Sequence, residues 1–163
     1  MIAIQQPERH DLLYINKLLE INAARGHFLP GRTDSILTAC FTNEYHKAPA
    51  TIRVAINKTD KWAPPDFAGF YLLTRADKTA HEEGLQNVQE IFAVAVQDDF
   101  QKKGVGRILL ENAVSKFQET RWAKYLIART HAGISTRMEH LLAQSSFTIF
   151  IQEEKVNFWA ISK

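Results

Sequence analysis

The stretch that decides the fold is Ile91-Phe-Ala-Val-Ala-Val-Gln-Asp-Asp-Phe-Gln-Lys-Lys-Gly-Val-Gly-Arg-Ile-Leu-Leu110. Its opening run, residues 91–96, is apolar and rich in β-branched side chains, which predicts a strand. A short polar loop and two glycines, Gly104 and Gly106, then precede an amphipathic segment that predicts a helix. Glycine permits left-handed backbone angles, and the first turn of a helix offers unpaired N–H groups and the positive end of its dipole. The stretch therefore predicts an anion-binding turn between a strand and a helix.

The spacing of the glycines narrows the choice of anion. A Walker-type loop requires four residues between its first glycine and a Gly-Lys-Ser/Thr, and the stretch has none. A dinucleotide fingerprint requires a further glycine where this chain has Leu109. The segment Gln101-Lys-Lys-Gly104-Val-Gly106 instead matches Gln/Arg-x-x-Gly-x-Gly/Ala and resembles the signature of the GNAT acyltransferase superfamily. The alternative is a helix that begins at a glycine and binds nothing.

Periodicity divides the remaining chain into elements whose order resembles that of the GNAT fold from end to end. Strands are predicted at residues 2–4, 51–56, 67–74, 91–96, 124–128, 147–151 and 156–161, and helices at residues 8–25, 33–45, 105–117 and 135–144. A right-handed crossover through the helix after the signature would make strands 91–96 and 124–128 parallel. The resemblance implies an α/β (α+β) fold, with a mixed, mostly antiparallel sheet of about seven strands. Helices would flank the sheet, and its central parallel pair would be splayed.

Composition and length set the class of protein. With 163 residues and 45% hydrophobic content, the chain is expected to form a single domain over residues 1–163. No apolar run is long enough to span a membrane, and residues 1–10 lack the regions of a signal peptide. A lone Cys40 suits a reducing compartment, and a net charge of +2 with interspersed acids does not favour nucleic acid. We expect a cytoplasmic protein without a membrane or nucleic-acid partner; a homodimer stays open.

The resemblance implies that acetyl-coenzyme A is the acyl donor and that the loop amides hold its pyrophosphate. Lys102, Lys103 and Arg107 add positive charge around this loop. Ser135 corresponds to an Asn that often begins the next helix in the family and contacts the cofactor. The implied cofactor-binding residues are Val94, Ala95, Val96, Gln101, Lys102, Lys103, Gly104, Val105, Gly106, Arg107 and Ser135. No metal is expected, because the histidines form neither a His-Glu-x-x-His motif nor a site with paired cysteines.

Acyl transfer to an amine needs a base for the amine and a hydrogen-bond donor for the oxyanion. Glu90 has the same offset from the signature as the general-base glutamate in the histone-acetyltransferase branch, so the resemblance implies that Glu90 is catalytic. The alternative is that Glu90 is a surface carboxylate at the end of a strand and that a chain of water molecules acts as the base. The main-chain N–H of Val94 is implied as the oxyanion donor.

The family's usual acid is where this sequence departs from the pattern. Many members carry a Tyr on the helix after the fifth strand, and the corresponding residue here is Leu142. His140 lies on another face of that helix and is expected to be exposed. His131, at the end of the preceding strand, is the better-placed candidate acid. Catalysis without a protein acid is the alternative, since a coenzyme A thiolate is a tolerable leaving group.

The acceptor pocket of the superfamily is walled by its first two helices and its last hairpin. The segment Arg25-Gly-His-Phe-Leu-Pro-Gly-Arg32 resembles the Gly-x-Leu-Pro-Arg region of amino-acid N-acetyltransferases such as N-acetylglutamate synthase. This resemblance implies that Phe28 and Arg32 contact the acceptor, with Arg32 gripping a carboxylate, although a plain loop is equally compatible. The predicted function is transfer of an acetyl group from acetyl-coenzyme A to a primary amine of a small molecule or amino acid by direct attack. The alternatives are a non-catalytic coenzyme-A-sensing or interaction module and a protein N-acetyltransferase.

Overall fold

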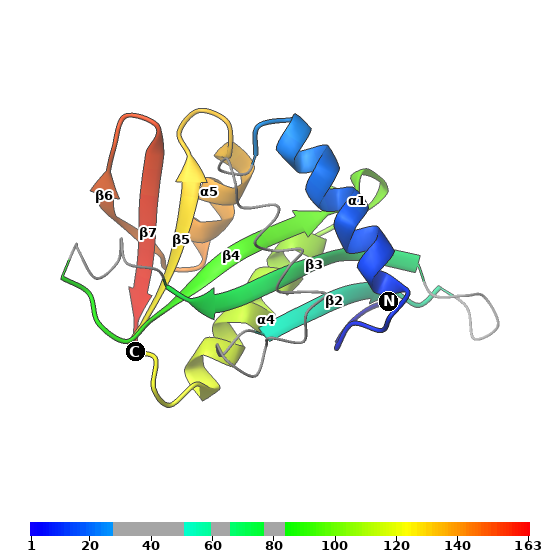
Figure 1. Cartoon of the computed structure of the whole chain (residues 1–163), viewed down its shortest axis with the longest axis horizontal. Coiled ribbons are helices and arrows are strands. Elements are labelled where there is room, and N and C mark those ends of the chain that lie inside the picture. The colour runs from blue at the N-terminus through cyan, green and yellow to red at the C-terminus, as the bar shows by residue number, and fades with distance from the viewer. Residues whose placement is uncertain (28–50, 60–65, 77–83) are drawn as a thin grey trace.

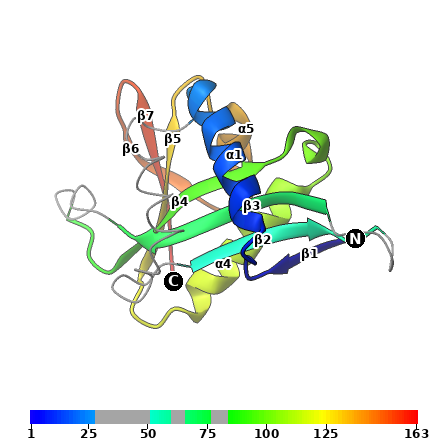
Figure 2. The same cartoon turned by 45° about the vertical axis from the view of Figure 1, so that its right-hand side comes forward.

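The sheet of this protein has seven strands in the described part of the chain. The computed structural model describes residues 1–27, 51–59, 66–76 and 84–163. The strands are β1 (Ile2–Gln5), β2 (Thr51–Asn57), β3 (Asp66–Arg75), β4 (Val88–Val96), β5 (Tyr125–His131), β6 (Thr148–Gln152) and β7 (Val156–Ser162). Their order is β1-β2-β3-β4-β5-β7-β6, with β1 at one edge and β6 at the other (Figure 2). The sequence predicted all seven, but β4 begins at Val88 rather than residue 91, and β5 continues to His131 rather than ending at residue 128.

The pairing of the strands confirms the predicted mixed sheet. Every neighbouring pair is antiparallel except β4 and β5, which are parallel. These two strands run side by side at one end and diverge toward the other (Figure 1). Their pairing extends only from Val88↔Tyr125 to Ile91↔Ala128. The sheet therefore has a splayed parallel pair at its centre.

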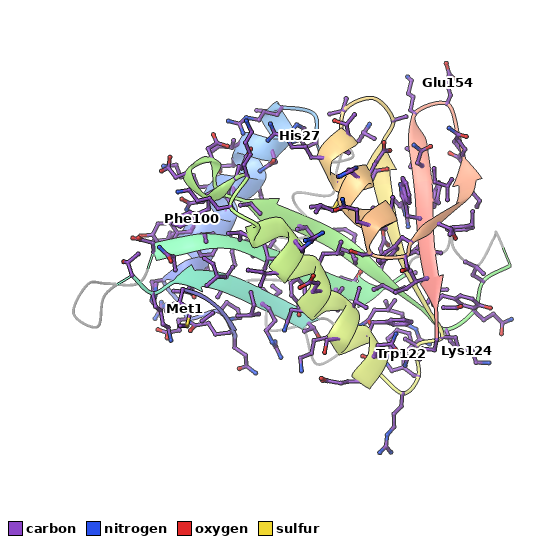
Figure 3. The ribbon with its side chains drawn as sticks, turned by 180° about the vertical axis from the view of Figure 1, so that it is seen from behind. Met1, His27, Phe100, Trp122, Lys124 and Glu154 are labelled. Carbon is purple, nitrogen blue, oxygen red and sulfur yellow. The ribbon has the colours of Figure 1, made fainter. Side chains whose placement is uncertain are left out.

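Three helices cover the sheet in the described part of the chain: α1 (Asp11–Ala24), α4 (Val105–Glu119) and α5 (Thr136–Gln144). Helix α1 crosses one face and α4 the opposite face, as the front and rear views show (Figures 1 and 3). The predicted apolar stripe of α4 is confirmed, because Val105, Leu109, Ala113 and Phe117 are all fully buried. The predicted helix at residues 33–45 lies outside the described residues.

A β-bulge at Phe92 causes the divergence of β4 from β5. On the other side of β4, strand β3 pairs Leu72 with Ala93 and Leu73 with Ile91, so Phe92 is an extra residue. A bulge shifts the alternation of side chains by one and bends the strand that carries it. Accordingly, Ile91 packs into the core cluster that contains α4, whereas Ala93 packs into the cluster that contains α1. The ladder with β5 ends at the residue before the bulge.

Gly69 allows β3 to approach the end of β4, where it pairs with Val96. A Cβ placed on Gly69 would lie 2.4 Å from the carbonyl oxygen of Ala95 and 3.1 Å from Cα of Val96. Both atoms belong to the backbone, so the clash can be relieved only by moving β4. We expect Gly69→Ala to lower the free energy of unfolding by about 1–3 kcal/mol, the usual range for overpacking, measured by urea unfolding.

Gly106→Ala is the matched control for Gly69→Ala. A Cβ on Gly106 meets only side-chain atoms, the nearest being Cδ1 of Leu141 at 3.3 Å. Gly106 lies inside α4, where Ala is favoured over Gly by roughly 0.5–1 kcal/mol. The control should therefore keep or raise stability. A Gly69→Ala protein as stable as the wild type would show that the two strands are not in tight contact.

Candidate active site

A cleft of about 850 Å³ opens where β4 and β5 diverge, a volume within the usual range of small-molecule sites. Residues 91–96 of β4 form one wall, and residues 128–130 of β5 with residues 134–138 and 140–142 form the other. The end of α1 and the loop before α4 complete it. His27, just after α1, and Phe100, in that loop, both line the cleft; Figure 3 labels the two residues. The bulge in β4 thus produces the hollow that the sequence signature borders.

The glycine turn at the start of α4 forms an open cradle. Gly104 is the N-cap of α4 and has a left-handed φ of 81°. A Cβ on Gly104 would meet no other atom of the described residues within 4 Å beyond its chain neighbours, so the described part of the chain leaves the space beside this turn open. The backbone N–H groups in the first turn of α4 have no partner within the helix, and the positive end of the helix dipole lies here. This geometry suits the phosphates of a coenzyme A, as the signature predicted.

The predicted loop residues divide into two groups. Gln101, Lys102, Gly104, Gly106 and Arg107 line the cleft, as do Val94, Ala95, Val96 and Ser135. Lys103 and Val105 do not line it: the ammonium of Lys103 lies 5.4 Å from the ring centroid of Phe100, and Val105 packs into the core. Any contact of Val105 with a cofactor would have to come from its backbone, because its side chain is buried.

The charged side chains that line the cleft have one sign. Among its described lining residues, the charged side chains are Arg25, Lys102, Arg107, Arg129 and Arg137, and none is Asp or Glu. Clefts lined by one sign of charge concentrate ligands of the opposite sign. The lining therefore favours a polyanionic ligand such as a phosphorylated cofactor.

The edge of β4 beyond the bulge is free of a strand partner on the β5 side, as far as the described residues show. Val94, Ala95 and Val96 lie along this edge and line the cleft. An unpaired edge presents main-chain N–H and C=O groups that can bind an extended ligand as another strand would. The oxyanion role of the Val94 N–H stays a prediction.

Glu90 is not the surface carboxylate at a strand end that the sequence left open. It is the third residue of β4, is 1% exposed, and does not line the cleft. Arg129 Nε lies 3.1 Å from Glu90 Oε1, and Arg129 Nη2 donates to Glu90 Oε2 at 3.2 Å. Arg129 does line the cleft, where its guanidinium also lies 5.5 Å from the ring centroid of Phe158. The sequence missed Arg129, because the predicted strand ended one residue before it.

His131 and Ser135 lie next to each other but only Ser135 reaches the cleft. The backbone N–H of His131 donates to Ser135 Oγ at 3.2 Å. The ring Nε2 of His131 is buried and has no hydrogen-bond partner within the described residues. His131 is therefore not brought to the cleft, although the sequence proposed it as the acid.

Two residues of α5 concern the general acid, because this chain lacks the Tyr that many family members carry. Leu142 is fully buried and lines the cleft, so the position of the family's Tyr faces the site with an apolar side chain. His140 is exposed, as predicted, and also lines the cleft. The His140 Nε2 lies 2.9 Å from Nε2 of Gln144, whose Oε1 accepts a hydrogen bond from Arg107. This arrangement makes Gln144 the donor to His140.

A chain of polar side chains crosses the mouth of the cleft between α1 and α5. Nη1 and Nη2 of Arg25 donate to the two carboxylate oxygens of Asp98, at 2.9 and 2.8 Å. Gln101 donates to Asp98 at 2.8 Å and accepts from Arg137 at 2.8 Å. The hydrogen bond between Arg25 and Asp98 raises the pKa of Arg25 and lowers the pKa of Asp98. Sequence reasoning did not predict this chain, which joins the end of α1 to the cofactor loop and to α5.

Three further predictions have a bearing on the site. Phe28 and Arg32 lie outside the described residues, so their contacts with an acceptor stay predictions. Within the described ranges, no group of three or more His, Cys, Asp or Glu side chains could hold a metal ion. The helices described here also include none that is long and apolar enough to cross a membrane.

The splayed parallel pair and the glycine turn at the start of α4 agree with the fold that the sequence signature implied. The model of the Acetyltransferase (GNAT) family matches residues 22–147. The chain belongs to this family. Comparison with curated protein sequences finds no match.

Solved structures of N-acetyltransferases share the fold at low sequence identity. Spermidine N-acetyltransferase from Vibrio cholerae, in complex with CoA and spermine, superposes with a TM-score of 0.72 at 16% identity, covering 99% of this chain and 95% of that one. The ribosomal-protein-S18-alanine N-acetyltransferase from Escherichia coli gives 0.65 at 16% identity, covering 99% and 94%. Arabidopsis thaliana NAA60, in complex with a bisubstrate analogue, gives 0.70 at 12% identity, covering 99% and 98%. These similarities support the fold and leave the acceptor open.

Proposed function

We propose that this protein transfers an acetyl group from acetyl-coenzyme A to a primary amine of a small molecule or amino acid by direct attack. The observation that carries the proposal is one cleft that combines the glycine turn, the unpaired edge of β4 and a cationic lining. Membership of the Acetyltransferase (GNAT) family supports it. When bound, acetyl-coenzyme A supplies an activated thioester.

The residues of the chain fit that cofactor in their chemistry. The first-turn N–H groups of α4 would hold the pyrophosphate, aided by Lys102 and Arg107. The edge of β4 from Val94 to Val96 would hold the extended arm, and the Val94 N–H would stabilise the oxyanion. Ser135, at the start of α5, would contact the cofactor from the opposite wall.

The geometry weakens the proposal that Glu90 is the base. Both of its oxygens face the guanidinium of Arg129, and Arg129 rather than Glu90 lines the cleft. An acceptor in the cleft would therefore meet the guanidinium before the carboxylate. Leu142 offers no proton to the leaving thiolate, which supports departure of coenzyme A without a protein acid.

The charges of the cleft favour some acceptors over others. Like charges placed together across an interface cost several kcal/mol. Arg25 and Arg129 are each paired with a carboxylate. A polycationic acceptor would therefore be repelled mainly by Lys102 and Arg137. An acceptor with a carboxylate or a neutral group beside its amine would not be repelled. The Vibrio cholerae relative was solved with spermine, but this cleft favours amino acids and neutral amines.

An acceptor panel tests the proposed function. Thiol release from acetyl-coenzyme A would be measured with amino acids, neutral alkylamines, spermine and peptides that carry a free N-terminus. We expect release with an amino acid or a neutral amine. The kcat/KM for spermine should be at least about tenfold lower than for these acceptors, because like charges repel.

Each other outcome of the panel identifies a different function. Cofactor binding without thiol release for any acceptor would indicate the sensing or interaction module. Release with peptides alone would indicate a protein N-acetyltransferase. Neither binding nor release would overturn the assignment of the cleft.

A further inference from the structure

A buried network of hydrogen bonds lies in the cleft wall formed by β5 and α5. Thr130 of β5 is 4% exposed and lines the cleft. Its hydroxyl accepts a hydrogen bond from Trp159 Nε1 at 3.0 Å and donates to Glu139 Oε1 at 2.7 Å. Asn157 Nδ2 donates to the same Glu139 oxygen at 2.8 Å. The network joins the cleft to a carboxylate on α5.

The direction of each hydrogen bond follows from the chemistry of the groups. An indole N–H can only donate and a carboxylate can only accept, so the Thr130 proton is directed at Glu139. A hydroxyl oxygen accepts two hydrogen bonds, and Trp159 supplies one of them. Thr130 Oγ1 therefore keeps one acceptor position, on a residue that lines the cleft.

Other lining residues in the described part of the chain contact carboxylates through a guanidinium or an amide, which cannot take up the proton of an amine, whereas Thr130 does so through a hydroxyl group. The lining itself contains no Asp or Glu, and Glu90 is engaged by Arg129. The hydroxyl of Ser135 accepts a hydrogen bond from the backbone of His131. A proton can therefore pass from the cleft through the hydroxyl group of Thr130 to a carboxylate.

We propose that Thr130 and Glu139 form a proton relay that serves as the general base for the acceptor amine. The proposal rests on the acetyl transfer proposed above. As the nitrogen lone pair forms the new C–N bond, an amine N–H bond breaks and its proton passes to Thr130 Oγ1. The Thr130 O–H bond breaks in turn, and its proton forms a new bond to Glu139 Oε1. Thr130 is the catalytic residue, and Trp159 and Asn157 are positioning residues that orient the relay.

Isosteric variants at the two relay positions test this proposal. Thr130→Val keeps the shape and removes the hydroxyl, and we expect kcat to fall about 100-fold, the usual scale for a lost base. Thr130→Ser keeps the hydroxyl and should restore kcat to within a few fold. Glu139→Gln should lower kcat like Thr130→Val, and the double variant should be no worse than either single, because the two residues act as one unit. The KM for acetyl-coenzyme A should change little in every case.

Thr120→Val is the matched control for loss of a hydroxyl. Thr120 donates a hydrogen bond to the carbonyl of Lys116 at the end of α4, and it does not line the cleft. Its loss should leave kcat unchanged.

Each result of this experiment bears on a distinct claim. Wild-type kcat in Thr130→Val, or failure of Thr130→Ser to restore it, would overturn the relay alone. Loss of cofactor binding together with kcat would show that Thr130 only shapes the wall, and would also overturn the relay. Absence of transfer by the unaltered protein would overturn the proposed function and the relay with it.

Discussion

Gly104→Asp is expected to abolish the binding of acetyl-coenzyme A while the protein stays folded. A carboxylate at this turn would enter the open space of the cradle and repel the pyrophosphate. The unaltered protein should gain about 2.7 kcal/mol of stability at a cofactor concentration 100 times Kd, because the ligand binds only the native state. This corresponds to a rise in Tm of roughly 5–10 °C for a chain of this length, and the variant should show none.

Two controls separate the charge at Gly104 from backbone strain. Gly104→Ala introduces a side chain at the same left-handed φ without a charge, so it should lose roughly 1–2 kcal/mol of stability but keep most of its affinity. Gly84 has the same φ of 81°, has nothing within 4 Å of a Cβ, and does not line the cleft. Gly84→Asp should therefore be strained to a similar extent and still bind. Unchanged affinity in Gly104→Asp would show that the cradle has been misassigned.

Glu90→Gln is expected to cost more stability than activity. Glu90 is 1% and Arg129 8% exposed at their side chains, so loss of the carboxylate removes a counter-charge from a buried guanidinium. Removing one member of a buried ion pair destabilises proteins by up to about 3–5 kcal/mol. We expect a fall in Tm on the order of 10 °C, with turnover of the folded fraction largely retained.

An exposed pair provides the comparison. Lys116 and Glu119 form an ion pair at 2.6 Å with Glu119 60% exposed, and Glu119→Gln should cost less than about 1 kcal/mol. The double variant Glu90→Leu with Arg129→Met should recover most of the lost stability, since apolar replacement of a buried pair is often neutral. A hundredfold fall in the turnover of Glu90→Gln with an unchanged Tm would contradict the prediction that this variant loses stability rather than activity. It would restore Glu90 as the base that the resemblance implied.

The pattern of residue types was enough to predict the order of the described strands along the chain, the parallel direction of β4 and β5, and the glycine turn. Residues 91–96 and the stripe Val105, Leu109, Ala113 and Phe117 show the periods of a strand and a helix, because each period reflects which side chains of one element are buried. The crossover rule then sets the direction of β5 relative to β4. Spacing alone also separated the turn at Gly104 from other phosphate loops.

Only the tertiary structure decided which side chains meet at the cleft. The bulge at Phe92 is defined by the register with β3, and the need for glycine at position 69 is defined by a carbonyl of β4. One extra residue in a strand moves every following side chain to the other face of the sheet. The partners Glu90 and Arg129, like Thr130 and Glu139, come from different elements and meet only after the sheet is assembled. Sequence periodicity reports the burial of each residue within its own element, whereas these contacts depend on register between elements.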